Sequence, residues 1–259
     1  MAAVIAAAIT AALFLRDSER DHVSAYIEDV NEVQQRSATR FGSVNQALEQ
    51  FELSADAAAE DLPELRRAAA TLTSLRVQVQ RIEAPEDARL LRARLIAFFK
   101  QQEAVARELV GVAVYLPKLS KAERPLPAVN RRLRSGLSDT SSLEAQANVV
   151  QRYARELARV AAALDAIEPP TLLRASHRAY VQQLRSYAAA SRALQSGIRA
   201  NDQAKVDAAI ERLRVASVAP PGAAKAQSAA IVAFNERVTK VNELGLAVEK
   251  ERRRLERDL

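Results

Sequence analysis

Hydrophobic residues recur three and four positions apart along most of the chain, which is the spacing of one face of a helix. The first such stripe runs from Val23 to Val33, and it resumes after a slip at Phe41 and ends at Phe51. Short polar or proline-containing segments separate it from the stripes that follow. We expect helices over residues 17–53, 62–83, 86–116, 126–135, 141–167, 171–199, 202–217 and 222–258. Because the connections are short, neighbouring helices are expected to pack antiparallel.

Three connections contain similar proline segments. They are IEAPEDAR at 82–89, IEPPTLLR at 167–174 and VAPPGAAK at 218–225. A proline disfavours the helical conformation of the residue before it, yet it fits the first turn of a new helix, where its missing N–H is not needed. The segments therefore predict helix–helix corners at Pro85, Pro170 and Pro221.

The first two corners belong to a longer internal repeat. A set of apolar positions recurs without gaps 85 residues further along the chain. Leu65, Leu72, Leu75, Val79 and Ile82 correspond to Val150, Leu157, Val160, Leu164 and Ile167. Since the proline is in register with both stripes, we interpret the repeat as a duplicated hairpin of two long helices.

Local signals refine the helix ends. After a small-residue break at 53–61, Asp61 and Pro63 form a good helix start, and the segments Thr140-Ser141-Ser142 and Asn201-Asp202 contain plausible N-caps. Pro117 is expected to close the most apolar run of the body, LVGVAVYL at 109–116. Two interpretations of this run stay open: a buried helix end, or a tip that touches a partner or a membrane.

The amino-terminal segment 2–15 is apolar on every helical face. It is shorter than the usual membrane span of about 20 residues. It also lacks the basic start and the small-residue cleavage site of a secretory signal. We expect an uncleaved, single-pass membrane anchor, with a buried first helix as the alternative. By the positive-inside rule Arg16 and Arg20 would draw the body toward the cytoplasm, although acidic residues lie among them. If a basic segment lies upstream of Met1, the same rule places the body outside the cytoplasm, and this is the orientation we expect.

Together these signals predict an all-α fold, an elongated antiparallel helical bundle built from duplicated long-helix hairpins on an N-terminal membrane anchor. The expected divisions are the anchor at 1–16, a first helical unit at 17–135 and a second at 136–259. One continuous bundle is the alternative to two units.

The composition is typical of long helices and excludes several kinds of site. Hydrophobic residues make up 49% of the chain but aromatic residues only 4%, and there are six glycines. A bias toward Ala, Leu, Arg and Glu is typical of long or coiled-coil helices. The chain has no cysteine, which excludes disulfides, thiolate metal sites, cysteine nucleophiles and a lipid-modified cysteine anchor.

The net charge of +6 is concentrated in residues 117–135. Against the single acidic residue Glu123, this stretch carries six basic residues: Lys118, Lys121, Arg124, Arg131, Arg132 and Arg134. One interpretation is a solvated loop, or arginines that pair with glutamates of the neighbouring helix. The functional interpretation is contact with an anionic envelope polymer or with lipid head groups, by a segment that Pro125 and Pro127 hold away from the bundle so that its charges are exposed. No DNA-binding module or aromatic stacking surface accompanies the charge, so no nucleic-acid partner is expected.

No motif indicates a metal, a cofactor or catalysis. Glu19 and His22 have the Glu-x-x-His spacing of di-iron bundles, but His177, the other histidine, is preceded by Arg174 at the matching place. Phosphate-binding glycine loops and nucleophile elbows are missing from the sequence.

Acidic residues with an arginine three or four positions away suggest solvated ion pairs. Examples are Glu103 with Arg107 and Glu156 with Arg159.

The sequence therefore predicts a non-enzymatic, membrane-anchored extracytoplasmic protein with a structural or partner-binding role at the bacterial cell envelope. One alternative is a ligand-sensing helical bundle, as in the anchored modules of chemoreceptors, although no signalling domain follows it. Another is peripheral binding of anionic lipid or polymer through 117–135. The partner and the oligomeric state stay open.

Overall fold

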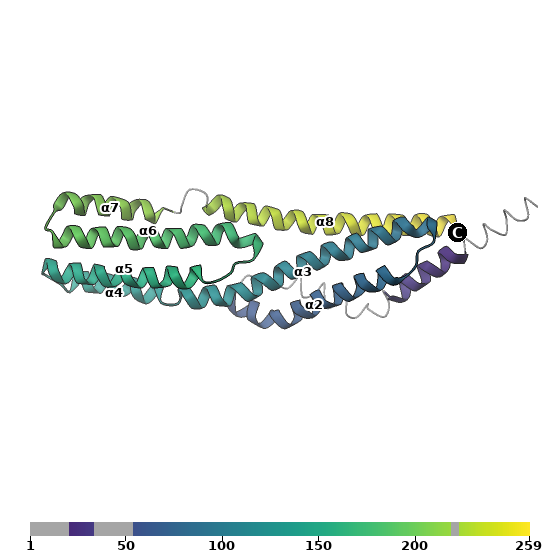
Figure 1. Ribbon diagram of the computed structural model, residues 1–259, viewed down its shortest axis with the longest axis horizontal. Coiled ribbons are helices and arrows are strands. Elements are labelled where there is room, and N and C mark those ends of the chain that lie inside the picture. The colour runs from purple at the N-terminus through teal and green to yellow at the C-terminus, as the bar shows by residue number, and fades with distance from the viewer. Residues whose placement is uncertain (1–20, 34–53, 219–222) are drawn as a thin grey trace, which may run out of the picture. The chain divides into compact units, whose positions relative to one another are not determined.

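The computed structural model describes residues 21–33, 54–218 and 223–259, and over these ranges the fold contains helices and no strand (Figure 1). The predicted all-α class is confirmed. Residues 21–33 are helical. The long helices that follow are α2 (Ala55–Arg81), α3 (Arg89–Glu123), α4 (Leu126–Ser138), α5 (Leu143–Asp165), α6 (Arg174–Arg199), α7 (Gln203–Ser217) and α8 (Ala223–Asp258).

The proline corners at Pro85 and Pro170 are confirmed and have the same geometry. Pro85 has φ −60° and ψ 164°, and Pro170 has φ −59° and ψ 155°. One 3₁₀ turn follows each proline, η1 (Glu86–Ala88) and η2 (Thr171–Leu173). In each turn an N–H, of Ala88 or Leu173, donates to the proline carbonyl at 3.0 Å. The predicted corner at Pro221 lies outside the described residues.

The repeated apolar positions form the core of both hairpins. In four of the aligned pairs every side chain is exposed by 3% or less. These pairs are Leu65 and Val150, Leu72 and Leu157, Leu75 and Val160, and Val79 and Leu164. The stripe that defines the repeat in the sequence is thus the stripe that each helix buries.

The chain divides into two compact units that are not consecutive in sequence. Among the described residues, unit 1 consists of 21–33, 61–110 and 235–259, and unit 2 of 54–60, 111–218 and 223–234. Helices α3 and α8 therefore contribute to both units.

Unit 1 is built on apolar residues from the 21–33 helix, α2, α3 and α8. Its buried cluster includes Tyr26, Leu72, Leu95 and Leu255. Ion pairs add to the contact between α3 and α8: Arg94 lies 3.1 Å from Glu251, and Arg237 lies 3.2 Å from Glu108.

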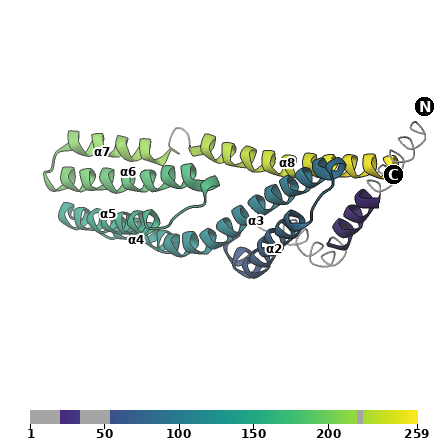
Figure 2. The ribbon, with the colours of Figure 1, turned by 45° about the vertical axis from the view of Figure 1, so that its right-hand side comes forward.

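In unit 2, α4, α5, α6 and α7 lie side by side in chain order (Figures 1 and 2). Helices α5 and α6 bury a cluster that includes Leu157, Leu164, Val181 and Leu184. Leu119, from the last turns of α3, packs against this cluster.

Two predicted helix ends are wrong, because the helices continue through Pro63 and Pro117. Helix α2 starts before Pro63, at Ala55, where the Ser54 hydroxyl accepts a hydrogen bond from Ala57 N–H at 3.2 Å. The alanine-rich first turns favour helix strongly. Beyond Pro117, Leu119 and Ala122 pack against the unit 2 core, and this burial outweighs the usual cost of an interior proline.

Among the helices that the structure describes, none combines the length and the apolar character needed to span a membrane. The predicted anchor at 2–15 and the parts of the predicted first helix at 17–20 and 34–53 lie outside the described residues.

Candidate anion-binding surface

The six basic residues of the 117–135 stretch lie on helices and on the turn that joins them. Lys118 and Lys121 occupy the last turns of α3, and Arg124 lies in the turn before α4. The other three, Arg131, Arg132 and Arg134, follow on α4.

The interpretation of this stretch as a loop held away by prolines is wrong. Pro125 directly precedes α4, and Pro127 lies in its first turn, where a proline is tolerated. Val129 is buried, and α4 packs along α5. The packed helix fixes the backbone from which the basic side chains project.

All six basic side chains are exposed, and within the described part of the chain none forms an ion pair or a hydrogen bond through its charged group. Arginines of unit 1 differ, since Arg76, Arg94 and Arg254 each pair with a carboxylate. The one acidic residue of the stretch, Glu123, hydrogen-bonds Tyr180. Burial first and this hydrogen bond second raise the pKa of Tyr180. The six cations are therefore uncompensated.

The positive charge extends beyond the 117–135 stretch. Residues 52–60 and 111–234, which span unit 2, contain eighteen Lys and Arg but twelve Asp and Glu, whereas the rest of the chain contains twenty of each. Unit 2 is thus the basic part of the protein, and its potential favours anionic partners.

A hollow of about 450 Å³, the α4–α5 groove, adjoins the basic residues. It is lined by Val129, Arg132, Leu133, Ser135, Gly136, Asp139, Val149, Arg152, Tyr153 and Glu156. The two helices approach closely at Gly136, where a Cβ would lie only 2.9 Å from Val149 Cγ1. The Tyr153 hydroxyl donates to Asn130 Oδ1 at 3.3 Å. Arg152, on α5, was not among the candidate residues of the sequence.

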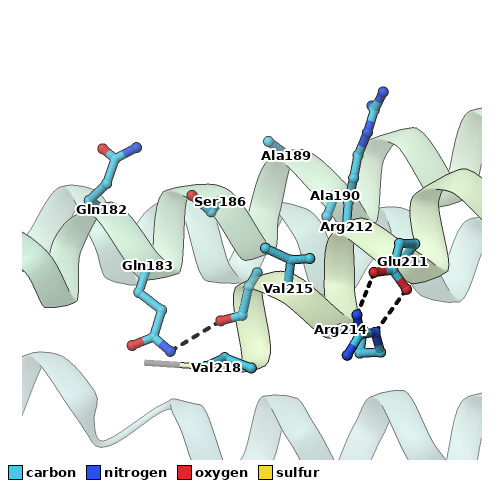
Figure 3. Close-up of a pocket in the computed structure, with 11 residues that line it drawn as sticks. Gln182, Gln183, Ser186, Ala189, Ala190, Glu211, Arg212, Arg214, Val215 and Val218 are labelled. Carbon is cyan, nitrogen blue, oxygen red and sulfur yellow. Dashed lines mark hydrogen bonds and ion pairs between the residues drawn. The ribbon is translucent and has the colours of Figure 1, made fainter. Parts of the chain in front are cut away.

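A second hollow of about 690 Å³ lies between α6 and α7 (Figure 3). Its lining is mostly apolar and includes Ala190, Val215 and Val218. The Gln183 side-chain amide donates to the Ala216 carbonyl at 3.1 Å and joins the two helices at this site (Figure 3). This hollow is in the size range of small-molecule sites.

Polar groups are also buried inside unit 2. The hydroxyl of Tyr115, on α3, lies 2.9 Å from His177 Nδ1, on α6. Burial lowers the pKa of His177, although Asp165 and a hydrogen bond with the Leu164 backbone oppose the shift. Burial raises the pKa of Tyr115 to about 12, and Glu123 adds to the rise. The surroundings of the pair therefore favour the neutral form of the His177 imidazole.

The predicted ion pairs of Glu103 with Arg107 and of Glu156 with Arg159 are both present. Glu103 is buried, however, which corrects the expectation of a solvated pair. It accepts hydrogen bonds from Thr73 Oγ1 and Arg76 Nε, both at 2.9 Å. The spacing to Arg107 could not reveal this burial, because Thr73 and Arg76 come from another helix.

The apolar run at 109–116 lies in the second half of α3, which continues to Glu123, so it is neither a helix end nor a tip. Leu109, Val112, Ala113 and Tyr115 are buried. The run therefore belongs to the core.

Across the described ranges, no group of three or more His, Asp or Glu side chains is placed to hold a metal ion. His22 is exposed, and Glu19 lies outside those ranges. Comparison with protein-family models, with curated proteins and with solved structures finds no match.

Proposed function

We propose that this chain is a non-enzymatic, membrane-anchored protein of the cell envelope whose antiparallel helical bundle binds phosphate-bearing lipid through the basic face of unit 2. The observation that carries the proposal is the set of six exposed cations without a partner in the described residues. Because packed helices carry five of the six residues, the backbone positions of those five are fixed before binding, and only the side chains have to be ordered.

The expected attraction is substantial. A lysine or arginine near an anionic membrane surface contributes about 1 kcal/mol. Six such residues, together with the wider excess of basic residues in 111–234, would therefore give binding that is strong at low salt and steeply weakened by salt.

Vesicle binding by substituted proteins tests the proposal. The full chain is held in neutral phosphatidylcholine nanodiscs on a sensor and exposed to phosphatidylglycerol vesicles. Replacement of Arg131, Arg132 and Arg134 with Gln is expected to abolish most of the binding and to leave the melting temperature unchanged. The matched control replaces three other exposed arginines with Gln: Arg66, Arg81 and Arg257.

The control lowers the net charge equally, so it separates a specific face from overall charge. Equal losses in both variants would contradict the proposal. Binding of a soluble anionic polymer in place of vesicles would identify an envelope polymer as the partner.

The location of the protein is part of the proposal. Residues 2–15 are uncharged and apolar on every helical face, which supports an uncleaved anchor. With a basic segment ahead of the anchor, the positive-inside rule would place the body outside the cytoplasm. Protease added to intact cells should digest the body. Full protection from the protease would show that the body faces the cytoplasm, and a new amino terminus beyond Arg16 would show that the anchor is cleaved.

Ligand sensing is the second candidate, and the apolar α6–α7 hollow favours it. A small apolar ligand bound there would raise the melting temperature of the full chain. Ala190→Phe should fill the space and remove this rise. Stabilisation that persists in this variant would place the ligand elsewhere.

A further inference from the structure

The α4–α5 groove brings two arginines from different helices to one hollow. Arg132 is supplied by α4 and Arg152 by α5. Both side chains are exposed, and in the described residues neither guanidinium has an ion-pair or hydrogen-bond partner. Two unpaired cations in one concave site oppose each other, so an anion between them would relieve the repulsion.

A phosphate fits this arrangement better than a carboxylate. A guanidinium is a planar fork that binds phosphate oxygens in pairs. Two forks from neighbouring helices can contact different oxygens of one tetrahedral group, whereas one planar carboxylate has only two oxygens to share. The close contact of Gly136 with Val149 fixes the two helices that carry the forks.

The acidic residues of the groove restrict the charge that it accepts. Glu156 is paired with Arg159 at 2.7 Å, so its charge is largely compensated. Asp139, at the end of α4, is exposed, and its carboxylate has no partner among the described residues. A free carboxylate repels further negative charge but accepts hydrogen bonds from hydroxyl groups.

We infer that the α4–α5 groove is a binding site for a phosphodiester that carries glycerol or sugar hydroxyls. Arg132 and Arg152 hold the phosphate, and the hydroxyls lie toward Asp139. The inference deepens the proposed function, because it gives the basic face a site for one head group. The same chemistry occurs in lipid head groups and in soluble phosphodiesters, so the test includes both sources.

The probe is glycerophosphoglycerol, the soluble head group of phosphatidylglycerol, titrated by NMR into the full chain in phosphatidylcholine nanodiscs. Arg132→Gln and Arg152→Gln should each weaken binding about tenfold, which corresponds to the loss of one charge-assisted hydrogen bond. Arg155→Gln is the matched control, since Arg155 is exposed on the same helix but does not line the groove. It should leave the affinity almost unchanged.

Each other result is decisive. Equal weakening by Arg152→Gln and Arg155→Gln would overturn the inference and leave the proposed vesicle binding intact. Inorganic phosphate that binds as tightly as the probe would overturn the role of the hydroxyls. Binding of the soluble probe without binding of vesicles would support the groove and contradict the lipid function. No binding of the probe to the unsubstituted protein overturns the inference outright.

Discussion

The Tyr115 hydroxyl and His177 Nδ1, 2.9 Å apart, join α3 to α6 inside unit 2. Both side chains are buried, so water does not compete with this polar contact. A neutral imidazole has one donor and one acceptor nitrogen, which suits contacts with a hydroxyl and with the Leu164 backbone. Protonation would turn both ring nitrogens into donors and place a charge where burial disfavours it.

This contact predicts a stability that falls in mild acid. The pKa of His177 is lowered from 6.5 by burial in the folded protein. Below pH 6.5 the unfolded chain therefore binds more protons at this histidine than the folded protein does. The contribution of His177 to the free energy of unfolding is complete above pH 6.5 and is lost as the pH falls toward the lower pKa of the folded state. His177→Gln should remove this component. Urea denaturation at pH of about 7.5 and about 5.5 measures it; an identical pH dependence in both proteins would contradict the account.

Glu103 should matter to unit 1 far more than an exposed glutamate does. Glu103→Gln weakens contacts with Arg76 and Thr73 in a buried place and is expected to cost about 2 kcal/mol. Glu86→Gln, which breaks an exposed pair with Arg89, should stay within about 0.5 kcal/mol. Both free energies of unfolding come from urea titrations, and equal values would show that the Glu103 contacts add nothing.

The same carboxylate also gives a pH dependence of its own. Burial alone would raise the pKa of Glu103, but hydrogen bonds from Arg76 and Thr73 and the nearby Arg107 lower it below 4.5. The stabilisation is therefore present above pH 4.5 and lost as the pH falls toward the folded pKa. Glu103→Gln should flatten the stability curve in this acidic window.

Gly197 sets the distance between α6 and α7. A Cβ there would lie 2.9 Å from the backbone nitrogen of Val206, an atom that cannot move without its helix. Gly197→Ala improves helix propensity by about 1 kcal/mol, but the clash costs about 1–3 kcal/mol. We expect a lower melting temperature. Gly245→Ala meets only the Phe98 ring, at 3.3 Å, and should lower it less; the opposite order would contradict this packing.

Ser142 caps α5, and it is one of the three cap candidates that the sequence offers at 140–142. Its hydroxyl accepts a hydrogen bond from Ala145 N–H at 3.2 Å. Ser142→Ala should cost about 1 kcal/mol, and Ser142→Gly a few tenths. Ser141→Ala is the control, because among the described contacts the Ser141 side chain has none. An equal loss of stability in Ser141→Ala would show that the Ser142 hydroxyl is not the cap of α5.

The sequence carries enough information for the helices and for two of the corners. Pro85 and Pro170 stand where the apolar stripes also stop, so local and long-range signals agree. Pro63 and Pro117 are different, because burial of apolar residues on both sides keeps the helix intact. Ala58 before Pro63 and Leu119 after Pro117 pack inward, and only the assembled core reveals that.

The candidate site was only partly visible in the sequence. The six basic residues are a local cluster, which composition detects directly. Arg152 is 18 positions beyond Arg134 and meets Arg132 at the groove only because α4 folds back along α5. Burial of Glu103 and the contact of Tyr115 with His177 likewise depend on helix pairing, for which a single sequence gives no direct signal.

The most direct test of the central claim is the salt dependence of vesicle binding. The full chain in neutral nanodiscs is exposed to phosphatidylglycerol vesicles while the ionic strength rises from about 0.1 M to about 1 M, where the screening length falls from about 10 Å to about 3 Å. We predict strong binding that is lost across this range, and little binding at any salt once Arg131, Arg132 and Arg134 are Gln. Binding that neither salt nor these substitutions change would contradict the account.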